Sequence, residues 1–593
     1  MNEEVVVKSG GARAAEERWF ASFDGAELFY RHWPASQASV GARKAVVLLH
    51  RGHEHSGRVE HLVPELGLED CDFFAWDARG NGRSEGPRDD AENFGCYARD
   101  AELFVRHLSE TEGVPIEQFA VVGHSVGAAI VAAWIHDYAP RLRAAVLATP
   151  AFRIRLYLPL AIPSLRMVLK LRIMKFVPSY VKARVLTHDL AQRIRHEQDT
   201  LISHGISSRV LVDLHDTATR LIQDAAAIRV PTLMLVAGSD WVVEPAAQMQ
   251  FFERLGSPVK HLEMLHGYYH DVYHEQDAER PLQLTRAFIE GAFVHPVDAT
   301  PLLDAHERGY TFEEYRALSR PLTPLSRKWI FYKAFGLFLR TLGRWSEGIR
   351  LGWESGFNSG RTLDYVYRNR PGGFTPLGRI IDRQYLNGAG WRGVRVRRRL
   401  LEEVVQQAIE ETHDRKRSVH LVDIAAGAGR YMLETLKRCE PLRLTAELRD
   451  FEPKNLEEGK AIARSLGLEN VTFVRDDAFH PGATDAVAPR PDIAVVSGLY
   501  ELFPDNAQVL RSLQRLARTI PAGGSLIYTN QPWHPQLELI ARGLSDWDGK
   551  PWVMRRRTQA EMDDLVREAG FEKTRMEIDQ WGMFTVSLAR RVS

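Results

Sequence analysis

The stretch Val121-Val122-Gly123-His124-Ser125-Val126-Gly127 decides how the first half of this chain folds. It has the pattern G-x-S-x-G, follows the apolar residues 119–122 and precedes the small-residue segment 128–136. This order predicts a strand, a sharp turn and a helix, with the hydroxyl of Ser125 exposed at the turn. Glycines suit such a turn because a Cβ there would collide with the neighbouring strand or helix. An ordinary strand-to-helix turn that happens to contain glycines is the alternative.

Length and composition limit the class of protein. A chain of 593 residues exceeds what one hydrophobic core organises, so at least two domains are expected. The 77 basic and 77 acidic residues cancel, which gives no indication of a nucleic-acid partner. Three scattered cysteines match no metal spacing and fit a reducing compartment. Residues 1–11 lack the apolar core of a signal peptide, and no apolar run is long enough to span a membrane, so we expect a cytoplasmic protein.

Apolar runs alternate with helix-length segments through the first half of the chain. The run at 45–50 is apolar almost throughout, which is typical of a strand buried on both faces of a parallel sheet. The alternation predicts repeated strand–helix units and a parallel sheet. We expect strands at residues 27–32, 45–50, 73–77, 119–122, 144–148 and 232–238.

Five motifs follow one another in a fixed order in this half. They are H-x-G-x-E-H-S-G-R from residue 50, D-x-R-G-x-G-x-S from 77, G-H-S-V-G from 123, P-T-L-x-L-x-x-G-x-D-x-V-V from 231 and G-x-Y-H from 267. Together they resemble the α/β-hydrolase fold and, within it, the monoacylglycerol lipase and lysophospholipase group, over about residues 25 to 292. The resemblance implies a serine hydrolase acting on a lipid or another small-molecule ester.

The resemblance places a nucleophile, an acid and a histidine on Ser125, Asp240 and His270. A turn or helix-cap role is the alternative for Asp240, and His266 and His274 compete with His270 for the role of the base. In acyl transfer the histidine takes the serine proton while the aspartate fixes the imidazole tautomer.

An oxyanion intermediate needs backbone N–H donors, each worth about 10²–10³ in rate. The residue after the nucleophile, Val126, supplies one, and the resemblance assigns the other to Gly52 in the loop after His50. Many relatives have glycine directly after this histidine, whereas this chain has Arg51. A cationic side chain here is expected either to alter the oxyanion hole or to select an anionic group of the substrate.

Residues 150–224 form an insertion that the resemblance implies is a lid over the site. Arg166, Lys170, Arg172 and Lys175 lie there among apolar residues, and no acid occurs from residue 151 to 188. The mixture predicts peripheral contact with an anionic membrane. An amphipathic cap helix that packs on the hydrolase core is the alternative.

Residues 294–394 join the two halves. A linker is expected at 295–301, followed by an apolar, aromatic helix at 327–342 whose first role would be packing against the next domain and whose second would be membrane contact. The segments 352–360 and 364–373 carry no assigned chemistry, although a roof over the second site is one role we consider for them.

The second half has its own turn after an apolar strand at 418–424. The pattern D-x-A-x-G-x-G places Asp423, Ala425, Gly427 and Gly429 in that turn. It resembles motif I of the class I S-adenosylmethionine-dependent methyltransferases over residues 395–593. A dinucleotide-binding Rossmann unit is the rival, but no G-x-G-x-x-G follows this strand, and the one at 388–393 follows a polar stretch and is read as chance.

Further positions follow the methyltransferase pattern, which ends in an antiparallel strand of a seven-stranded sheet. Asp450, about 20 residues past the glycines, would bind the ribose hydroxyls, with Glu452 as its competitor. The resemblance assigns Asp477 to the adenine amino group and adds Phe479 and Ser497 to the cofactor site. S-adenosylmethionine is the expected cofactor, and no metal is expected.

The methyl acceptor is the least determined part of the sequence. The candidates for this site are Tyr500, Glu501 and His534. We expect each of them to support neighbouring groups and not to act as the catalytic base. The segment N-Q-P-W at 530–533 faintly resembles an amino-methylase motif, but it follows the fifth strand instead of the fourth and is discounted.

The sequence therefore predicts a bifunctional α/β enzyme. Residues 1–293 would be the hydrolase, 294–394 a linker and helical extension, and 395–593 a Rossmann-like methyltransferase with a small-molecule or lipid acceptor. A methyltransferase whose hydrolase-like half only binds a lipid or an ester is the alternative.

Overall fold

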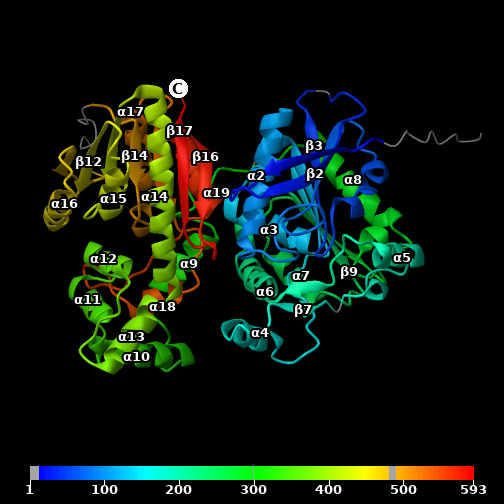
Figure 1. Ribbon diagram of the computed structural model, residues 1–593. Coiled ribbons are helices and arrows are strands. Elements are labelled where there is room, and N and C mark those ends of the chain that lie inside the picture. The colour runs from blue at the N-terminus through cyan, green and yellow to red at the C-terminus, as the bar shows by residue number, and fades with distance from the viewer. Residues whose placement is uncertain (1–12, 40, 180, 298, 480–488, 593) are drawn as a thin grey trace, which may run out of the picture. The chain divides into compact units, whose positions relative to one another are not determined.

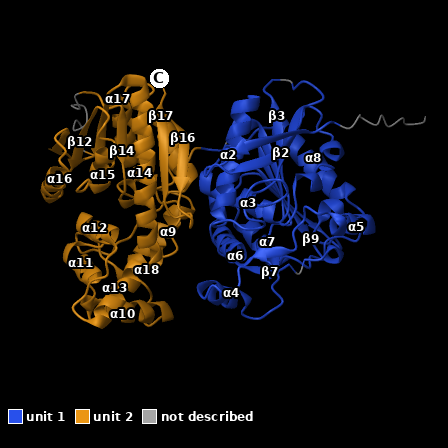
Figure 2. Cartoon of the chain, in the orientation of Figure 1, with its two compact units in different colours: residues 1–300 blue, residues 301–593 orange. Residues whose placement is uncertain are grey.

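The protein, seen in a computed structural model, forms two compact units, Met1–Thr300 and Pro301–Ser593 (Figure 2). The structure describes residues 13–39, 41–179, 181–297, 299–479 and 489–592. Each unit has a sheet and cores of its own, so each is described by itself.

Unit 1 contains an eight-stranded sheet in the order β1-β2-β4-β3-β5-β6-β9-β10 (Figure 1). The antiparallel strands β1 and β2 lie at one edge, and the other strands run parallel to one another. Their carboxyl ends therefore meet at one edge of the sheet, where residues far apart in the sequence come together. The strands are β1 (Glu16–Ala21), β2 (Glu27–Trp33), β3 (Lys44–Leu49), β4 (Cys71–Trp76), β5 (Phe119–His124), β6 (Ala144–Ala148), β9 (Thr232–Ala237) and β10 (Lys260–Leu265).

Helices pack on this sheet because its central strands are apolar on both faces. Alternate residues such as Val46 and Leu48 of β3 share one core with α1 and α8. Helix α3 contacts β3, β5 and β6 and packs beside α2 and α6. The helices are α1 (Leu62–Leu66), α2 (Gly95–Glu112), α3 (Val126–Tyr138), α6 (Ser208–Gln223), α7 (Pro245–Arg254) and α8 (Glu279–Val294).

The insertion between β6 and α6 is built differently. It contains α4 (Ala161–Lys170), β7 (Phe176–Pro178), α5 (Leu190–Gln198) and β8 (Gly205–Ser207), and β7 pairs with β8. None of the residues of α4 is buried. This helix contacts α6 but adds no fully buried side chain to the core of unit 1.

Unit 2 contains a seven-stranded sheet in the order β13-β12-β11-β14-β15-β17-β16. The first five strands are parallel, and β17 lies antiparallel between β15 and β16. This is the antiparallel ending that the methyltransferase resemblance predicts. The strands are β11 (Val419–Ile424), β12 (Leu444–Asp450), β13 (Val471–Arg475), β14 (Ile493–Val496), β15 (Ser525–Asn530), β16 (Phe571–Ile578) and β17 (Thr585–Arg591).

Two sets of helices complete unit 2. One set accompanies the sheet and consists of α14 (Ala389–Lys416), α15 (Arg430–Arg438), α16 (Pro453–Leu466), α17 (Asn506–Thr519) and α19 (Gln559–Glu568), whereas the short helix α18 (Leu537–Gly543) lies apart from it. The other precedes it and consists of α9 (Tyr310–Ser319), α10 (Arg327–Arg340), α11 (Glu347–Ser355), α12 (Gly360–Arg368) and α13 (Pro376–Leu386). Helices α10 to α13 form a group below the sheet in Figure 1, and α10 contacts α18. Among the described helices of the whole chain, none combines the length and the apolar character that crossing a membrane requires.

Candidate functional site

The turn between β5 and α3 holds Ser125 in a strained conformation. Its φ of 55° and ψ of −112° are unfavourable for a residue with a side chain. A Cβ on Gly123 would lie 2.7 Å from Cα of Ala128, and one on Gly127 would lie 2.4 Å from the carbonyl oxygen of His50. The two glycines are therefore required by close packing, as the sequence pattern predicts.

Three side chains from separate loops form a hydrogen-bonded chain at this turn. Nε2 of His270 lies 2.7 Å from Oγ of Ser125, and its Nδ1 lies 2.8 Å from Oδ2 of Asp240. The backbone N–H groups of Val242 and Val243 donate to Oδ1 of Asp240. Burial would raise the pKa of Asp240, but His270 and these hydrogen bonds hold it below its ordinary value. The geometry joins a hydroxyl, an imidazole and a carboxylate, and it selects His270 over His266 and His274.

The two expected oxyanion donors lie side by side. Val126 is the first residue of α3, so its N–H has no acceptor within the helix. A Cβ on Gly52 would lie 2.9 Å from Cγ2 of Val126, which shows how closely the loop after β3 approaches the helix start.

Arg51 forms a buried ion-pair cluster. Its Nε lies 2.9 Å from Oε2 of Glu54, and its Nη2 lies 2.6 Å from Oε1 of Glu54 and 3.5 Å from Oδ2 of Asp271. Burial acts to raise the pKa of both carboxyl groups, but the charge of Arg51 holds each pKa well below its ordinary range. The guanidinium is thus bound by two carboxylates. Sequence reasoning missed both partners, although an acid three residues after Arg51 was a signal for one of them.

The insertion contacts both loops that flank Ser125. Nε2 of His55 lies 2.9 Å from Oδ2 of Asp199, and the N–H of Asp271 donates to the carbonyl of Leu186 at 2.8 Å. Thr187 donates its hydroxyl to the carbonyl of His274 at 2.7 Å. Residues 186–199 therefore lie against the serine site, whereas α4 lies exposed.

The glycine-rich turn of unit 2 follows β11 directly. Ala425, Gly427 and Gly429 all have φ between 55° and 65°, in the left-handed region. A Cβ on Gly429 would lie 2.1 Å from Cδ2 of Leu448, so the turn packs tightly on β12. A Cβ on Gly427 would meet no atom within 4 Å, so this side of the turn faces open space. The turn thus presents backbone to a ligand while its other side is fixed to the sheet.

Asp423 is an uncompensated buried carboxyl group at the end of β11. It is 1 % exposed, and neither of its oxygens has a hydrogen-bond partner among the described residues. Burial raises its pKa to about 8, and the neighbouring Tyr431 phenol and the charge of Asp450 have smaller effects. Such a group requires an explanation, and a cationic ligand would provide one.

Asp450 ties the end of β12 to the glycine turn. Its Oδ2 accepts the N–H of Gly427 at 2.8 Å, and its Oδ1 accepts from the N–H of Glu452 and from Nδ2 of Asn455. Glu452 is exposed and caps α16. Asp450 is therefore the acid that lies at the turn.

The remaining predicted cofactor residues follow β13 and β14 at the same edge of the sheet. Asp477 accepts the N–H of Phe479 at 2.9 Å, and the ring of Phe479 lies 4.4 Å from that of Phe503. Asp476 instead pairs with Arg449 at 2.8 Å. Ser497 follows the last residue of β14.

The three acceptor candidates occupy different surroundings. Tyr500 is buried in the core, and its hydroxyl lies 3.2 Å from Oγ of Ser512. Glu501 lies beside the carboxyl end of β15, where Oε1 accepts from the hydroxyl of Thr529 at 3.0 Å. His534 borders an apolar pocket, and burial lowers its pKa to about 4.

One residue of this region was missed. Arg397 of α14 lies 3.4 Å from Oε1 of Glu501, and its Nη2 would lie 3.2 Å from a Cβ on Gly498. The arginine is buried at the carboxyl end of β14. Four other arginines occur between residues 392 and 399, so nothing in the sequence marked this one.

Comparisons with known proteins match each unit to a family. A family model described as "Putative methyltransferase" matches residues 285–591, which is more than half of the chain. A hydrolase family model described as "Serine aminopeptidase, S33" matches residues 41–277. These matches confirm the predicted α/β-hydrolase fold and the methyltransferase-like second half.

Individual relatives match either nearly the whole chain or about half of it. The chain is 46 % identical over 98 % of its length to the uncharacterized protein YnbC of Escherichia coli K12, of which 99 % is covered. It is 26 % identical to a monoacylglycerol lipase of Mycolicibacterium smegmatis, over 46 % of this chain and 96 % of that protein. A crystal structure of Paleococcus ferrophilus monoacylglycerol lipase is 20 % identical, covers 48 % of this chain and 99 % of that one, and has a TM-score of 0.39.

The full-length relative covers both units, so the same two-part chain occurs in another protein. The chain is thus a member of the "Putative methyltransferase" family that carries an α/β-hydrolase domain ahead of its methyltransferase domain.

Proposed function

We propose that the protein is bifunctional, with a serine ester hydrolase in unit 1 and an S-adenosylmethionine-dependent methyltransferase in unit 2. The observation that carries the first activity is the continuous hydrogen-bonded chain from Ser125 through His270 to Asp240. The uncompensated carboxyl of Asp423 beside an open glycine turn carries the second. Relatives named for monoacylglycerol lipase activity favour a lipid ester as the substrate of unit 1.

In the hydrolase, Oγ of Ser125 attacks the ester carbonyl while Nε2 of His270 takes its proton. The N–H groups of Val126 and Gly52 stabilise the oxyanion that forms. His270 then gives the proton to the leaving alcohol, and an acyl-serine remains. Water attacks this ester with His270 again as base, which releases the acid and restores Ser125. Asp240 keeps Nδ1 protonated throughout.

The buried position of Arg51 supports a working hydrolase over a binding module. Its guanidinium is paired with Glu54 and Asp271 and is not available to the oxyanion or to a substrate anion. Asp271 directly follows His270, so the cluster also fixes the segment that carries the base. The sequence raises the expectation that Arg51 alters the oxyanion hole. Its pairing with two carboxylates, which the sequence pattern does not reveal, argues against that effect.

A fluorophosphonate probe tests the hydrolase directly. We expect the wild-type protein to be labelled and the Ser125→Ala variant to show no labelling. Ser164→Ala, in the exposed helix α4, is a matched control and should label like the wild type. An unlabelled wild-type protein would instead support a binding module in unit 1.

The residues of unit 2 fit a cationic cofactor. Asp423 would hold an ammonium group, Asp450 the ribose hydroxyls, and the backbone at Gly427 would line the path between them. S-adenosylmethionine supplies an electrophilic methyl group on a sulfonium when it is bound. The protein's part is to position the acceptor beside that methyl and to exclude water.

Calorimetric titration with S-adenosylmethionine tests this assignment. We expect Asp450→Ala to abolish measurable binding, because it removes both the ribose partner and the acceptor for the N–H of Gly427. Glu452→Ala is the control and should bind as tightly as the wild type, since Glu452 is exposed. Loss of binding in the control alone would make Glu452 the ribose ligand and reject our assignment.

A further inference from the structure

Unit 2 contains an apolar pocket of about 400 Å³ that the cofactor residues do not account for. Its volume lies in the range of pockets that bind small organic ligands. The walls come from α10, α11, α13, the start of α14 and residues 531–554, so helices of the preceding group and loops that follow the sheet meet here. Phe338, Leu339, Ile381, Leu544 and Trp552 are representative of the lining.

The polar groups of the pocket are few and uncharged. No aspartate, glutamate, lysine or arginine is among its lining residues. Nε2 of Gln531 and Nε1 of Trp552 are buried donors that have no acceptor among the described residues. Nδ1 of His534 accepts the N–H of Gln536 at 3.0 Å, which assigns the ring proton to Nε2. The pocket therefore offers unused N–H donors in apolar surroundings.

The pocket adjoins the carboxyl edge of the sheet. Gln531 directly follows Asn530, the last residue of β15. Phe584, a lining residue, lies under the guanidinium of Arg397 at 5.2 Å. The same guanidinium approaches Gly498, just beyond β14. Because β14 is the neighbour of β11 in the sheet, the end of the pocket at Gln531 and the glycine turn after β11 lie at the same edge of the sheet.

Helix α14 approaches the pocket closely because two of its residues are glycines. A Cβ on Gly390 would lie 2.8 Å from Nε2 of His534, and one on Gly393 would lie 2.8 Å from the ring of Phe584. The G-x-G-x-x-G at 388–393 thus has a packing role in a helix.

We propose that this pocket binds the apolar body of the methyl acceptor, and that the acceptor is an uncharged amphiphile with an oxygen acceptor near Gln531. The proposal rests on the methyltransferase function proposed above and names the class of its substrate. An apolar body matches the lining, and an oxygen matches the unused donors. A carboxylate is disfavoured because no cation lines the pocket to balance it, and burying an unpaired charge is costly.

A matched pair of probes tests the class of ligand. We expect calorimetry at pH 7.5 to show binding of 1-octanol, with octanoate bound at least tenfold more weakly. Affinity should rise about fourfold per methylene from butanol to octanol, which corresponds to about 0.8 kcal/mol per buried CH₂. Equal or tighter binding of octanoate, or an affinity independent of chain length, would overturn the proposal.

A second set of measurements places the ligand in the pocket. Phe338 lines the rim, whereas its neighbour Leu337 on α10 is 65 % exposed and outside the lining. Phe338→Asp should weaken octanol binding at least tenfold and leave the affinity for S-adenosylmethionine unchanged, and Leu337→Asp should change neither. Equal weakening in both variants would show that octanol binds elsewhere.

Simultaneous occupancy links the pocket to methyl transfer. Octanol and S-adenosylmethionine should bind together, because an acceptor has to lie beside the cofactor without replacing it. Competition between them would assign the pocket to the cofactor and overturn the proposal. Failure of S-adenosylmethionine to bind the wild type, with octanol binding intact, would refute the proposed methyltransferase while leaving a neutral-ligand pocket.

Discussion

Two buried aspartates at strand ends are held in opposite states by their surroundings. Asp240 has His270 and two backbone N–H groups as partners, and these hold its pKa below the ordinary value despite burial. Asp423 has no hydrogen-bond partner among the described residues, and burial raises its pKa to about 8. The first is poised as a permanent anion, and the second is neutral until a cation or a higher pH ionises it.

Replacing Asp240 by asparagine should remove the anion and keep the shape. The amide would no longer stabilise the imidazolium or fix the tautomer of His270, so the rate of fluorophosphonate labelling should fall by about 10⁴-fold. Asp277→Asn, at an exposed position, should label at the wild-type rate. A rate for Asp240→Asn within tenfold of the wild type would contradict the role assigned to Asp240.

Asp423 should make the stability of unit 2 depend on pH. Its folded pKa of about 8 lies above an unfolded value of about 3.9, so the folded state binds the extra proton between these two values. Stability contributed by the neutral acid is full at low pH and is lost as pH rises toward 8. In thermal unfolding from pH 5 to 9, the melting temperature of Asp423→Asn should rise relative to that of the wild type as the pH rises. Parallel curves for the two proteins would reject the raised pKa.

Some site residues could be predicted from the sequence, and others could not. Ser125, Asp240 and His270 lie together because each follows a parallel strand, and the carboxyl ends of parallel strands meet at one edge of the sheet. The order of the motifs along the chain was enough to predict this. The roles of Glu54 and Arg397 were not predicted, because a buried ion pair forms only where the fold brings two charged side chains together away from solvent. Such partners lie among many other charged residues in the sequence, so only three-dimensional packing distinguishes them.

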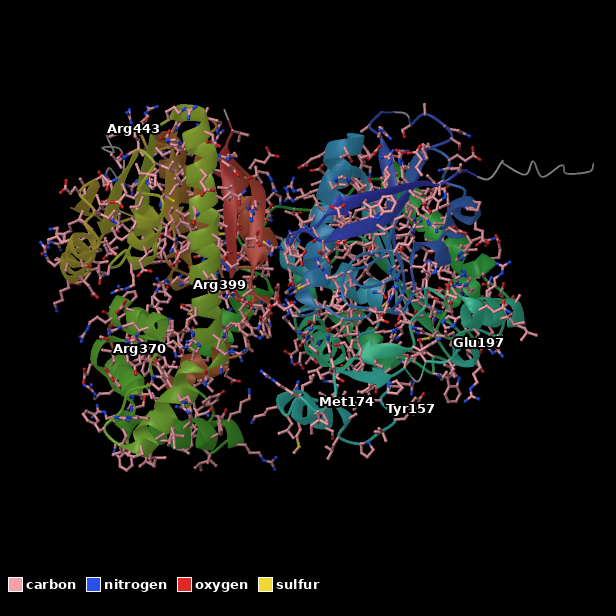
Figure 3. The ribbon with its side chains drawn as sticks, viewed as in Figure 1. Tyr157, Met174, Glu197, Arg370, Arg399 and Arg443 are labelled. Carbon is pink, nitrogen blue, oxygen red and sulfur yellow. The ribbon has the colours of Figure 1, made fainter. Side chains whose placement is uncertain are left out.

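At the scale of elements, the exposed insertion around α4 is the strongest candidate for a membrane contact. Leu160, Met167 and Ile173 are 75 %, 64 % and 70 % exposed. Tyr157 and Met174, labelled in Figure 3, precede and follow this helix and are exposed as well. Helix α4 also contacts α6 and half-buries Ile162, Leu165 and Val168, as the amphipathic-cap alternative expects. From the exposed apolar residues beside the cations we propose that this segment binds anionic lipid.

Neutralising two cations of this segment should weaken vesicle binding. Arg166 pairs with Asp216 and Lys175 lies 3.1 Å from Asp90, so Lys170 and Arg172 are the better choices for substitution. Each cation near an anionic surface contributes about 1 kcal/mol, so replacing both with glutamine should weaken sedimentation with anionic vesicles about 30-fold. Replacing Lys437 and Arg438 of α15, which lie in unit 2, is the control. Equal binding by both double variants would remove the insertion from the contact.

The elements themselves were largely predictable, because apolar runs and glycine turns depend on local sequence. Residues 45–50 were expected as a strand and the structure has Lys44–Leu49, while 327–342 became the helix Arg327–Arg340. The apolar pocket was not predictable. It arises where helices separated by up to 200 residues of sequence meet the loop after β15, and periodicity along one segment cannot report such a meeting.

For the whole molecule, each site is completed within one unit. The hydrolase residues lie between Arg51 and Asp271, and the cofactor turn and the apolar pocket lie between Phe335 and Phe584. Sites that share no residue or hydrogen-bond network should respond independently to substitution. Ser125→Ala should therefore leave the affinity for S-adenosylmethionine within about twofold of the wild type, a difference of about 0.4 kcal/mol. Asp450→Ala should likewise leave fluorophosphonate labelling at the wild-type rate.

Measuring both readouts on both variants gives a complete test of that independence. If the Ser125→Ala substitution shifts cofactor affinity, or Asp450→Ala slows labelling, the two sites are energetically coupled. If neither does, the two sites work independently within one chain. Adding octanol to the labelling reaction extends the test, because a ligand confined to the pocket of unit 2 should not change the rate at Ser125.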